Sequence, residues 1–219
     1  MALTKYNFNS FDLTTAASKG LAFNSSANGF TTATEGSITL IKTLSASSSS
    51  NLQFINGSSD VVLDGTYTVY LFKFISLHFS DDACNFQVAF RDGGSSYDAT
   101  KTSNYGYAYH EESGSNSGIT RDDSRANDAS TSVQTLGQNI GNGNDESFSG
   151  SMYLFNPAST TFQKHYMSSV NYYQSDNKSE NAFVGGYCDV TAAIDAVQFD
   201  PSAGTIDTGT IKLYGIKDS

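Results

Sequence analysis

The sequence predicts an all-β protein, an antiparallel β-sandwich of jelly-roll type with about 8–11 strands. The composition is the first reason, because 33 Ser, 21 Thr, 17 Asn and 19 Gly among 219 residues favour turns and extended structure over helix. The second is a series of short apolar runs separated by turn signals, with only 2 prolines. No fixed repeat period is present, which disfavours a propeller or a solenoid.

The chain is long enough for one medium domain, since it has 219 residues of which 38% are hydrophobic. Residues 1–35 alternate small polar residues with isolated aromatics and show no sustained period. We therefore predict an N-terminal arm or attachment segment over residues 1–35 and a β-sandwich domain over residues 36–219.

The N-terminal half of the predicted domain contains the strongest strand signals. Ile38, Leu40 and Leu44 fall on one face of an extended segment, and a short strand over 52–55 precedes an Asn-Gly turn. Thr66–Phe79 is rich in β-branched and aromatic residues on both faces, so we expect a strand in the middle of a sheet. The segment Phe86–Arg91 alternates cleanly, which predicts a strand with one wet face.

Residues 92–147 are the most polar part of the chain and predict a tyrosine-bearing strand, a long loop and a short strand. The tyrosine strand is expected at 105–110 and the short strand at 133–136. Further strands are expected at 147–155, 160–167, 182–187, 193–199 and 210–216. The last two of these should form a hairpin.

The charge and the cysteines restrict the partners and the compartment. A formal charge of −10 disfavours binding to nucleic acid or to an anionic membrane. The most apolar run, Val69–Phe79, is too short to span a bilayer, and no secretory signal is visible, so we expect synthesis in a cytoplasm. Cys84 and Cys188 are far apart in sequence and are expected to be buried free thiols.

No metal or nucleophile site is predicted. The three histidines lie at positions 78, 110 and 165, without the spacing of metal ligands, and no nucleophile-elbow motif is present. Asn142–Glu146 offers oxygen ligands for calcium but lacks the spaced acidic pattern of a dedicated loop. We therefore expect no metal and no cofactor.

Paired carboxylates are the remaining catalytic candidates. Glu111 with Glu112, and Asp122 with Asp123, would serve glycoside hydrolysis only if they converged on a substrate. Both pairs lie in hydrophilic sequence without an apolar pocket, so solvated loop charges are expected and no catalytic residue is predicted.

Aromatic side chains supply the candidate contact residues. Tyr105, Tyr107 and Tyr109 alternate and should project to one face of a strand. Such tyrosines stack on sugar rings or pack in cores and subunit interfaces, and packing is the favoured interpretation. Together with Phe8 and Phe11 of the arm, they form the predicted interface to other copies or partners.

Several blocks of the sequence resemble virion structural proteins of tailed bacteriophages, particularly those of marine and cyanobacterial hosts. The closing segment AIDAVQFDPSAGTIDTGTIKLYGIK resembles their C-terminal hairpin. VVLDGTYTVYLFKFISLHFSDD, FQVAFRDGGSSYDATKT, AYHEESG and MYLFNPASTTFQKHY resemble the body of the same proteins, in the same order. The resemblance covers about residues 37–217. It implies a β-sandwich in a homo-oligomer on the particle exterior, with no catalytic residues.

The chain lacks the heptads, repeat shaft and separate attachment domain of a full tail fibre. This favours a small non-enzymatic component, either a capsid decoration (cement) protein or a compact tail or baseplate fibre component. We expect a homo-oligomer, with a trimer favoured, that also contacts another virion protein such as the major capsid protein or a tail protein. The alternative is a host-receptor or carbohydrate-binding module of the tail that recognises a host-surface glycan.

Overall fold

The computed structural model describes residues 21–23, 26, 30–32 and 36–217. The chain divides into two units, Met1–Thr39 and Leu40–Ser219. In the first, β1 (Leu21–Phe23) pairs antiparallel with β2 (Phe30–Thr32). Phe8 and Phe11 lie outside the described residues, and the predicted arm boundary at residue 35 stays a prediction.

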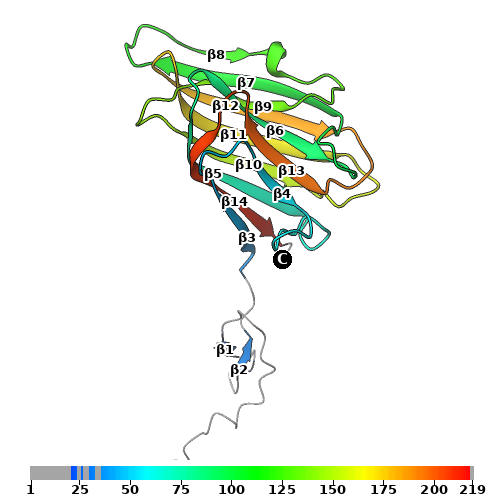
Figure 1. Ribbon diagram of the computed structural model, residues 1–219. Coiled ribbons are helices and arrows are strands. Elements are labelled where there is room, and N and C mark those ends of the chain that lie inside the picture. Colours follow the sequence, from blue (N-terminus) through cyan, green and yellow to red (C-terminus); the bar gives the residue numbers. More distant parts are fainter. Residues whose placement is uncertain (1–20, 24–25, 27–29, 33–35, 218–219) are drawn as a thin grey trace, which may run out of the picture. The chain divides into compact units, whose positions relative to one another are not determined.

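The rest of the described chain forms a single sheet of 12 strands (Figure 1). The strands are β3 (Ile38–Ser45), β4 (Leu52–Ile55), β5 (Val69–Phe79), β6 (Cys84–Arg91), β7 (Lys101–Glu111), β8 (Ser117–Arg121), β9 (Gln134–Ile140), β10 (Phe148–Phe155), β11 (Lys164–Gln174), β12 (Lys178–Cys188), β13 (Ala196–Pro201) and β14 (Ile206–Ile216). A 3-10 turn, η2 (Asp123–Arg125), follows β8. Among the described residues, no helix is long and apolar enough to cross a membrane.

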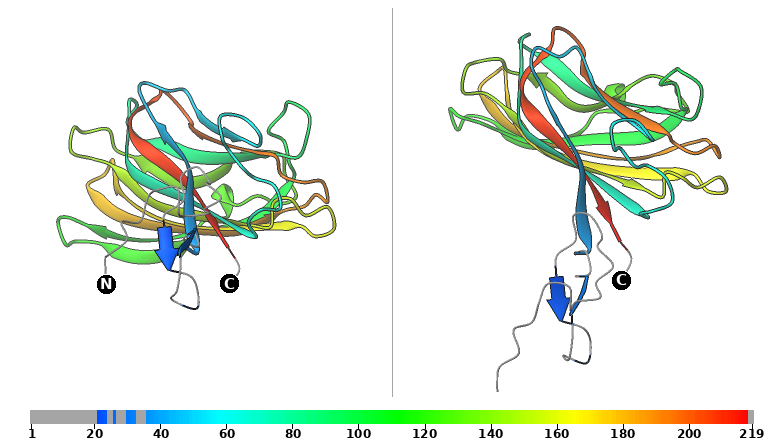
Figure 2. Two further views of the ribbon diagram at one scale, coloured as in Figure 1. Left: turned by 90° about the horizontal axis from the view of Figure 1, so that it is seen from below. Right: turned by 60° about the horizontal axis from the view of Figure 1, so that its bottom comes forward.

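The sheet has two limbs that are joined at one point. The long limb has the order β3-β14-β5-β10-β11-β12-β7-β8, and the short limb has the order β9-β6-β13-β4. Between β11 and β9 the register contains one residue pair, Gln174 with Ile140. Because this link is so short, the sheet can bend sharply there, and Figure 2 shows the sheet curving round so that it nearly closes on itself.

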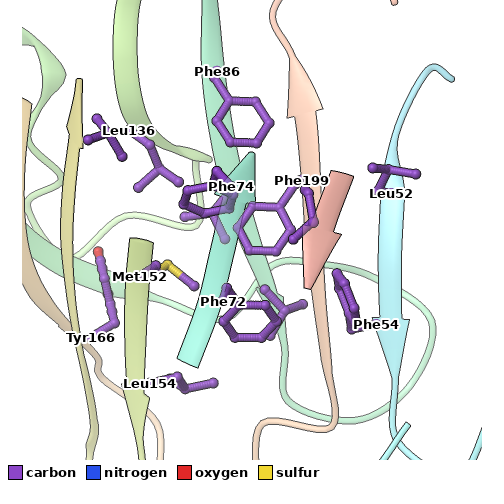
Figure 3. Packing of buried hydrophobic residues seen from close by; sticks show 14 of the residues in the cluster. Leu52, Phe54, Phe72, Phe74, Phe86, Leu136, Met152, Leu154, Tyr166 and Phe199 are labelled. Carbon is purple, nitrogen blue, oxygen red and sulfur yellow. The ribbon is translucent and has the colours of Figure 1, made fainter. Parts of the chain in front are cut away.

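Aromatic rings fill the space between the two limbs (Figure 3). The ring centroid of Phe74 in β5 lies 5.4 Å from that of Phe86 in β6 and 5.2 Å from that of Phe199 in β13, and both pairs have edge-to-face geometry. Phe148 of β10 lies 4.9 Å from Phe86. All four rings are buried, so each removes a large apolar area from water and adds ring-to-ring attraction between limbs.

The predicted all-β antiparallel class is confirmed, and β5 lies in the middle of the long limb as expected. The predicted hairpin of the last two strands was wrong, because β13 pairs with β4 and β6 whereas β14 pairs with β3 and β5. The strand count was too low, partly because β8 was missed. Every residue of β8 is exposed, so this strand carries no apolar alternation that a sequence could show. The finer description as a jelly-roll sandwich stays a prediction.

The first predicted strand is present as β3, and its apolar residues are not equally buried. In β3, Ile41 and Leu44 pack against the core, whereas Ile38 and Leu40 are exposed. The strand forms one end of the long limb, where it pairs with β14 alone.

The cysteine prediction is confirmed, because Cys84 and Cys188 are free and buried. Burial raises the pKa of the Cys188 thiol to about 12. Cys188 stands between Lys164 and Lys101 in the register of three neighbouring strands, and both lysines are fully buried. Their ammonium groups donate to the carbonyl oxygens of Val190 (2.7 Å) and Ala99 (2.8 Å) respectively, so they anchor loops at this end of the sheet.

The ring cluster gives a direct stability prediction. Phe199→Ala should lower the free energy of unfolding by about 3–5 kcal/mol, because it removes a buried ring that contacts the opposite limb. Phe162→Ala is the matched control, since this side chain is 69% exposed, and it should change stability by no more than about 0.5 kcal/mol. Urea unfolding measures both variants. Equal effects of the two substitutions would contradict the shared core.

Candidate functional site

The inward face of the long limb changes character along β7. Tyr105, Tyr107 and Tyr109 all point to this face, as the alternation predicts. Tyr105 is buried in the core and is therefore inaccessible to a partner. Tyr107 and Tyr109 are half-buried. The face therefore passes from core into an open polar pocket within one strand.

We call this hollow the tyrosine pocket; its volume is about 420 Å³. It is lined by Tyr107, Tyr109, Thr120, Asp122, Arg125, Gln138, Asn139, Gln174, Lys178 and Glu180. These residues come from β7, β8, β9, β11, β12 and the η2 segment, so both limbs contribute to it. The volume lies within the range of about 300–1,000 Å³ that is usual for small-molecule sites.

The two tyrosine rings are neighbours in the pocket, with centroids 6.0 Å apart. The ammonium group of Lys178 lies 5.6 Å from the centroid of Tyr109, and the Tyr109 hydroxyl donates to Asn116 Oδ1 at 3.3 Å. Tyr109 is therefore fixed by neighbours. The Tyr107 hydroxyl makes no hydrogen bond to any residue that the structure describes.

Glu180 forms the buried end of the pocket and is 1% exposed. Its Oε1 atom accepts hydrogen bonds from the Tyr172 hydroxyl and from Gln138 Nε2, the latter at 3.2 Å. Burial raises the pKa of Glu180, and the charge of Asp122 adds to this effect, whereas the two hydrogen bonds oppose it. Oε2 receives neither of these bonds.

The η2 segment carries two further charges of the pocket. Asp122 Oδ1 accepts from the backbone N–H of Ser124 at 2.9 Å and caps the turn. Arg125 Nε donates to Gln138 Oε1 at 3.3 Å, and the Arg125 carbonyl accepts from Gln134 Nε2 at 3.1 Å. The pocket thus has two acidic side chains and two basic ones, all held by neighbouring groups.

The four carboxylates considered for glycoside hydrolysis do not come together. Asp122 lines the pocket, but Glu111, Glu112 and Asp123 do not. Glu111 faces Lys178 at 3.8 Å, and Asp123 pairs with Arg121 at 2.6 Å on the exposed surface. In the candidate calcium loop, Glu146 Oε2 accepts from the Gly143 N–H at 2.7 Å. Within the described ranges, no group of three or more His, Cys, Asp or Glu side chains could hold a metal ion.

A second hollow lies on the outward face of the long limb. Its rim carries Tyr153 and Phe155 of β10, Met167 of β11 and Phe183 of β12, and its volume is about 600 Å³. Phe183 also borders a neighbouring hollow with Ile119 of β8. We call these five residues the outer apolar stripe.

Small residues create the space beneath the stripe. Ser151, Ser169 and Gly185 contribute to the lining of this second hollow. Gly106 of β7 is opposite Phe183 in the register, and a Cβ atom at Gly106 would lie 2.4 Å from the Phe183 ring. Glycine at position 106 is therefore what lets this ring lie flat against the sheet.

Comparison with known proteins gives no relative: no family model, no curated protein and no solved structure matches the chain. The candidate sites therefore depend on their own geometry. Sequence reasoning singled out Tyr107, Tyr109 and Asp122 but missed Glu180, Arg125 and Gln138. Glu180 occupies a buried position in the alternation of β12. This alternation is hard to recognise in the sequence, because the residues around Glu180 are also polar.

The raised pKa of Glu180 predicts a pH effect on stability. Because the folded state holds the proton more tightly than the unfolded state, the contribution of this carboxyl is present below its ordinary pKa of 4.5 and is lost as the pH rises through the folded value. As the pH rises from 4.5 to 7, the free energy of unfolding of Glu180→Gln should therefore fall less than that of the parent.

Urea unfolding at a series of pH values measures this difference. Glu112→Gln, at an exposed carboxyl, is the control and should follow the parent curve. Parallel curves for Glu180→Gln and the parent would show that burial does not perturb Glu180.

Proposed function

We propose that this chain is a non-enzymatic structural component of a tailed-phage virion, exposed on the particle surface as a homo-oligomer. The resemblance of residues 37–217 to phage virion proteins motivates the assignment. The observation that carries the self-association is the outer apolar stripe. Free cysteines and an acidic composition suit a protein that is made in a reducing host cytoplasm and then stays soluble on a particle.

The stripe has the properties of a contact surface between copies. Tyr153, Met167 and Phe183 are 37%, 59% and 40% exposed, and Ile119 is 75% exposed. Soluble monomers rarely expose contiguous apolar area of this kind. The second hollow, beneath the stripe, is lined by no charged side chain, although the chain has a net charge of −10. Two copies can therefore meet there without bringing acidic groups together.

This surface replaces the tyrosine strand as the proposed self-interface. Tyr105 is in the core, and Tyr107 and Tyr109 line a pocket on the inward face. The arm, with Phe8 and Phe11, remains the proposed contact to another virion protein, such as the major capsid protein or a tail protein. Capsid decoration and a compact tail or baseplate position are both compatible with these features, and a trimer is the proposed assembly.

We interpret the two limbs as the layers of a jelly-roll-like sandwich. The chain crosses from one limb to the other on both sides of β4, of β6, of β9 and of β13. Rings from both limbs meet in one core, which is the defining contact of a sandwich.

A charge placed in the stripe should separate the copies. Met167→Glu introduces an acidic group where two apolar surfaces would meet, so the assembled protein should shift toward monomer by about tenfold or more in dissociation constant. Sedimentation equilibrium measures the shift. Phe162→Glu, at an exposed apolar residue outside the stripe, should leave the assembly unchanged. A monomeric parent, or an unchanged Met167→Glu assembly, would reject the stripe as the interface.

Removal of residues 1–30 tests the arm. The shortened chain should keep the fold of its 12-stranded sheet, since every described residue in the core or packed against it lies beyond position 40, but it should no longer attach to particles. Circular dichroism checks the fold, and co-sedimentation with particles that lack the parent protein checks attachment. Normal decoration of particles by the shortened chain would remove the arm from the account.

A further inference from the structure

We propose that the tyrosine pocket is a binding site for a neutral saccharide unit, of the kind found at the end or within the chain of a surface glycan. This inference goes beyond the virion role and does not depend on it. Self-association through the outer apolar stripe and saccharide binding in the pocket use opposite faces of the long limb.

The first argument is the pair of tyrosine rings at a polar site. A sugar ring presents an apolar C–H face and a rim of hydroxyl groups, and an aromatic ring covers the former well. Tyr107 and Tyr109 are half-buried rather than covered, so part of their ring area is open to a ligand. Since Tyr109 is held by Lys178 and Asn116, Tyr107 is the ring with the freer hydroxyl group.

The second argument is the supply of hydrogen-bonding groups around the rings. Gln138, Asn139 and Gln174 bring side-chain amides, which both donate and accept. Thr120 adds a hydroxyl group. Glu180 adds its Oε2 atom, since the hydrogen bonds from Tyr172 and Gln138 both go to Oε1. Sugar hydroxyls also donate and accept, so such a mixed set suits them better than it suits an apolar or purely anionic ligand.

The third argument is charge. Asp122 and Glu180 oppose Arg125 and Lys178 within the pocket, and Lys178 also faces Asp176 at 3.5 Å and Glu111 at 3.8 Å. No excess of positive charge remains to attract a phosphate, sulfate or uronate group. The balance therefore selects a neutral sugar over an acidic one.

The fourth argument is rigidity. Glu180, Tyr172 and Gln138 form a buried network, because the Tyr172 hydroxyl also accepts from the Gln138 backbone N–H at 2.9 Å. Gln138 Oε1 in turn accepts a hydrogen bond from Arg125 Nε, so the network extends to the rim of the pocket. Groups that are already fixed lose little entropy when a ligand binds, which favours affinity and selectivity.

A glycan array tests the proposal with the full chain. The array carries neutral oligosaccharides of glucose, galactose, mannose, rhamnose and N-acetylglucosamine, beside sialylated, sulfated and uronate-containing ones. We expect binding to at least one neutral class in preference to the acidic classes. Binding to no neutral glycan, or a preference for acidic glycans, would overturn the proposal.

Calorimetric titration with the best neutral oligosaccharide then locates the site. Tyr107→Ala should weaken binding by about tenfold or more, whereas Tyr107→Phe keeps the ring and should stay within about threefold. Thr120→Arg places a bulky charge at the pocket edge on an exposed strand and should also weaken binding by about tenfold, with no core residue changed.

Tyr187→Ala is the matched control, because it removes a half-buried tyrosine that belongs neither to the tyrosine pocket nor to the outer apolar stripe, and it should bind like the parent. Thermal unfolding of each variant separates loss of the site from loss of the fold. Equal affinity of Tyr107→Ala and the parent, or loss of binding only in Tyr187→Ala, would place the site elsewhere. Neither result would affect the test of self-association by Met167→Glu.

Discussion

Contact between aromatic rings of the two limbs is the interaction on which the rest of this structure depends. A sheet of 12 strands folds over when one of its faces carries enough apolar side-chain area for burial of that area to drive the closure. Phe74 and Phe148 on one limb meet Phe86 and Phe199 on the other, so closing the sheet removes all four rings from water. The pairing of β11 with β9 through one residue pair permits that closure.

The two limbs differ in strand number, and this difference leaves inward-facing surface for a site. In the register of β11, β12 and β7, the buried Lys164–Cys188–Lys101 row lies at one end and the apolar core lies in the middle. Toward the other end come Glu180 with Tyr109, and then Lys178 with Glu111. The tyrosine pocket is thus the place where the core ends and water begins, which is why it combines rings with charges.

The fold class was predictable because strands with one buried face alternate in sequence, as the segment of β6 does with Phe86, Val88 and Phe90. The alternation of Tyr105, Tyr107 and Tyr109 likewise predicted a shared face. It could not predict where along that face burial would end, since this depends on how far the opposite limb reaches.

Other features lie beyond sequence reasoning for physical reasons. Lys101 and Lys164 are expected at the surface on composition grounds. Their burial depends on carbonyl groups, those of Ala99 and Thr131 for Lys101 and that of Val190 for Lys164. The partners of Glu180 come from β9 and β11, so a local pattern around position 180 does not reveal them. The outer apolar stripe is similarly assembled from four strands, each of which contributes one or two residues.

Native-state hydrogen exchange tests most directly whether the two limbs form one cooperative core. The account predicts that the slowest amides of β5 and β10 in the long limb and of β6 and β13 in the short limb share one free energy of opening, equal to that of global unfolding. The amides of the exposed edge strand β8 should open at much lower free energy. If the amides of the short limb opened at a much lower free energy than those of the long limb, the account would be contradicted, because the rings would then not hold the two limbs together.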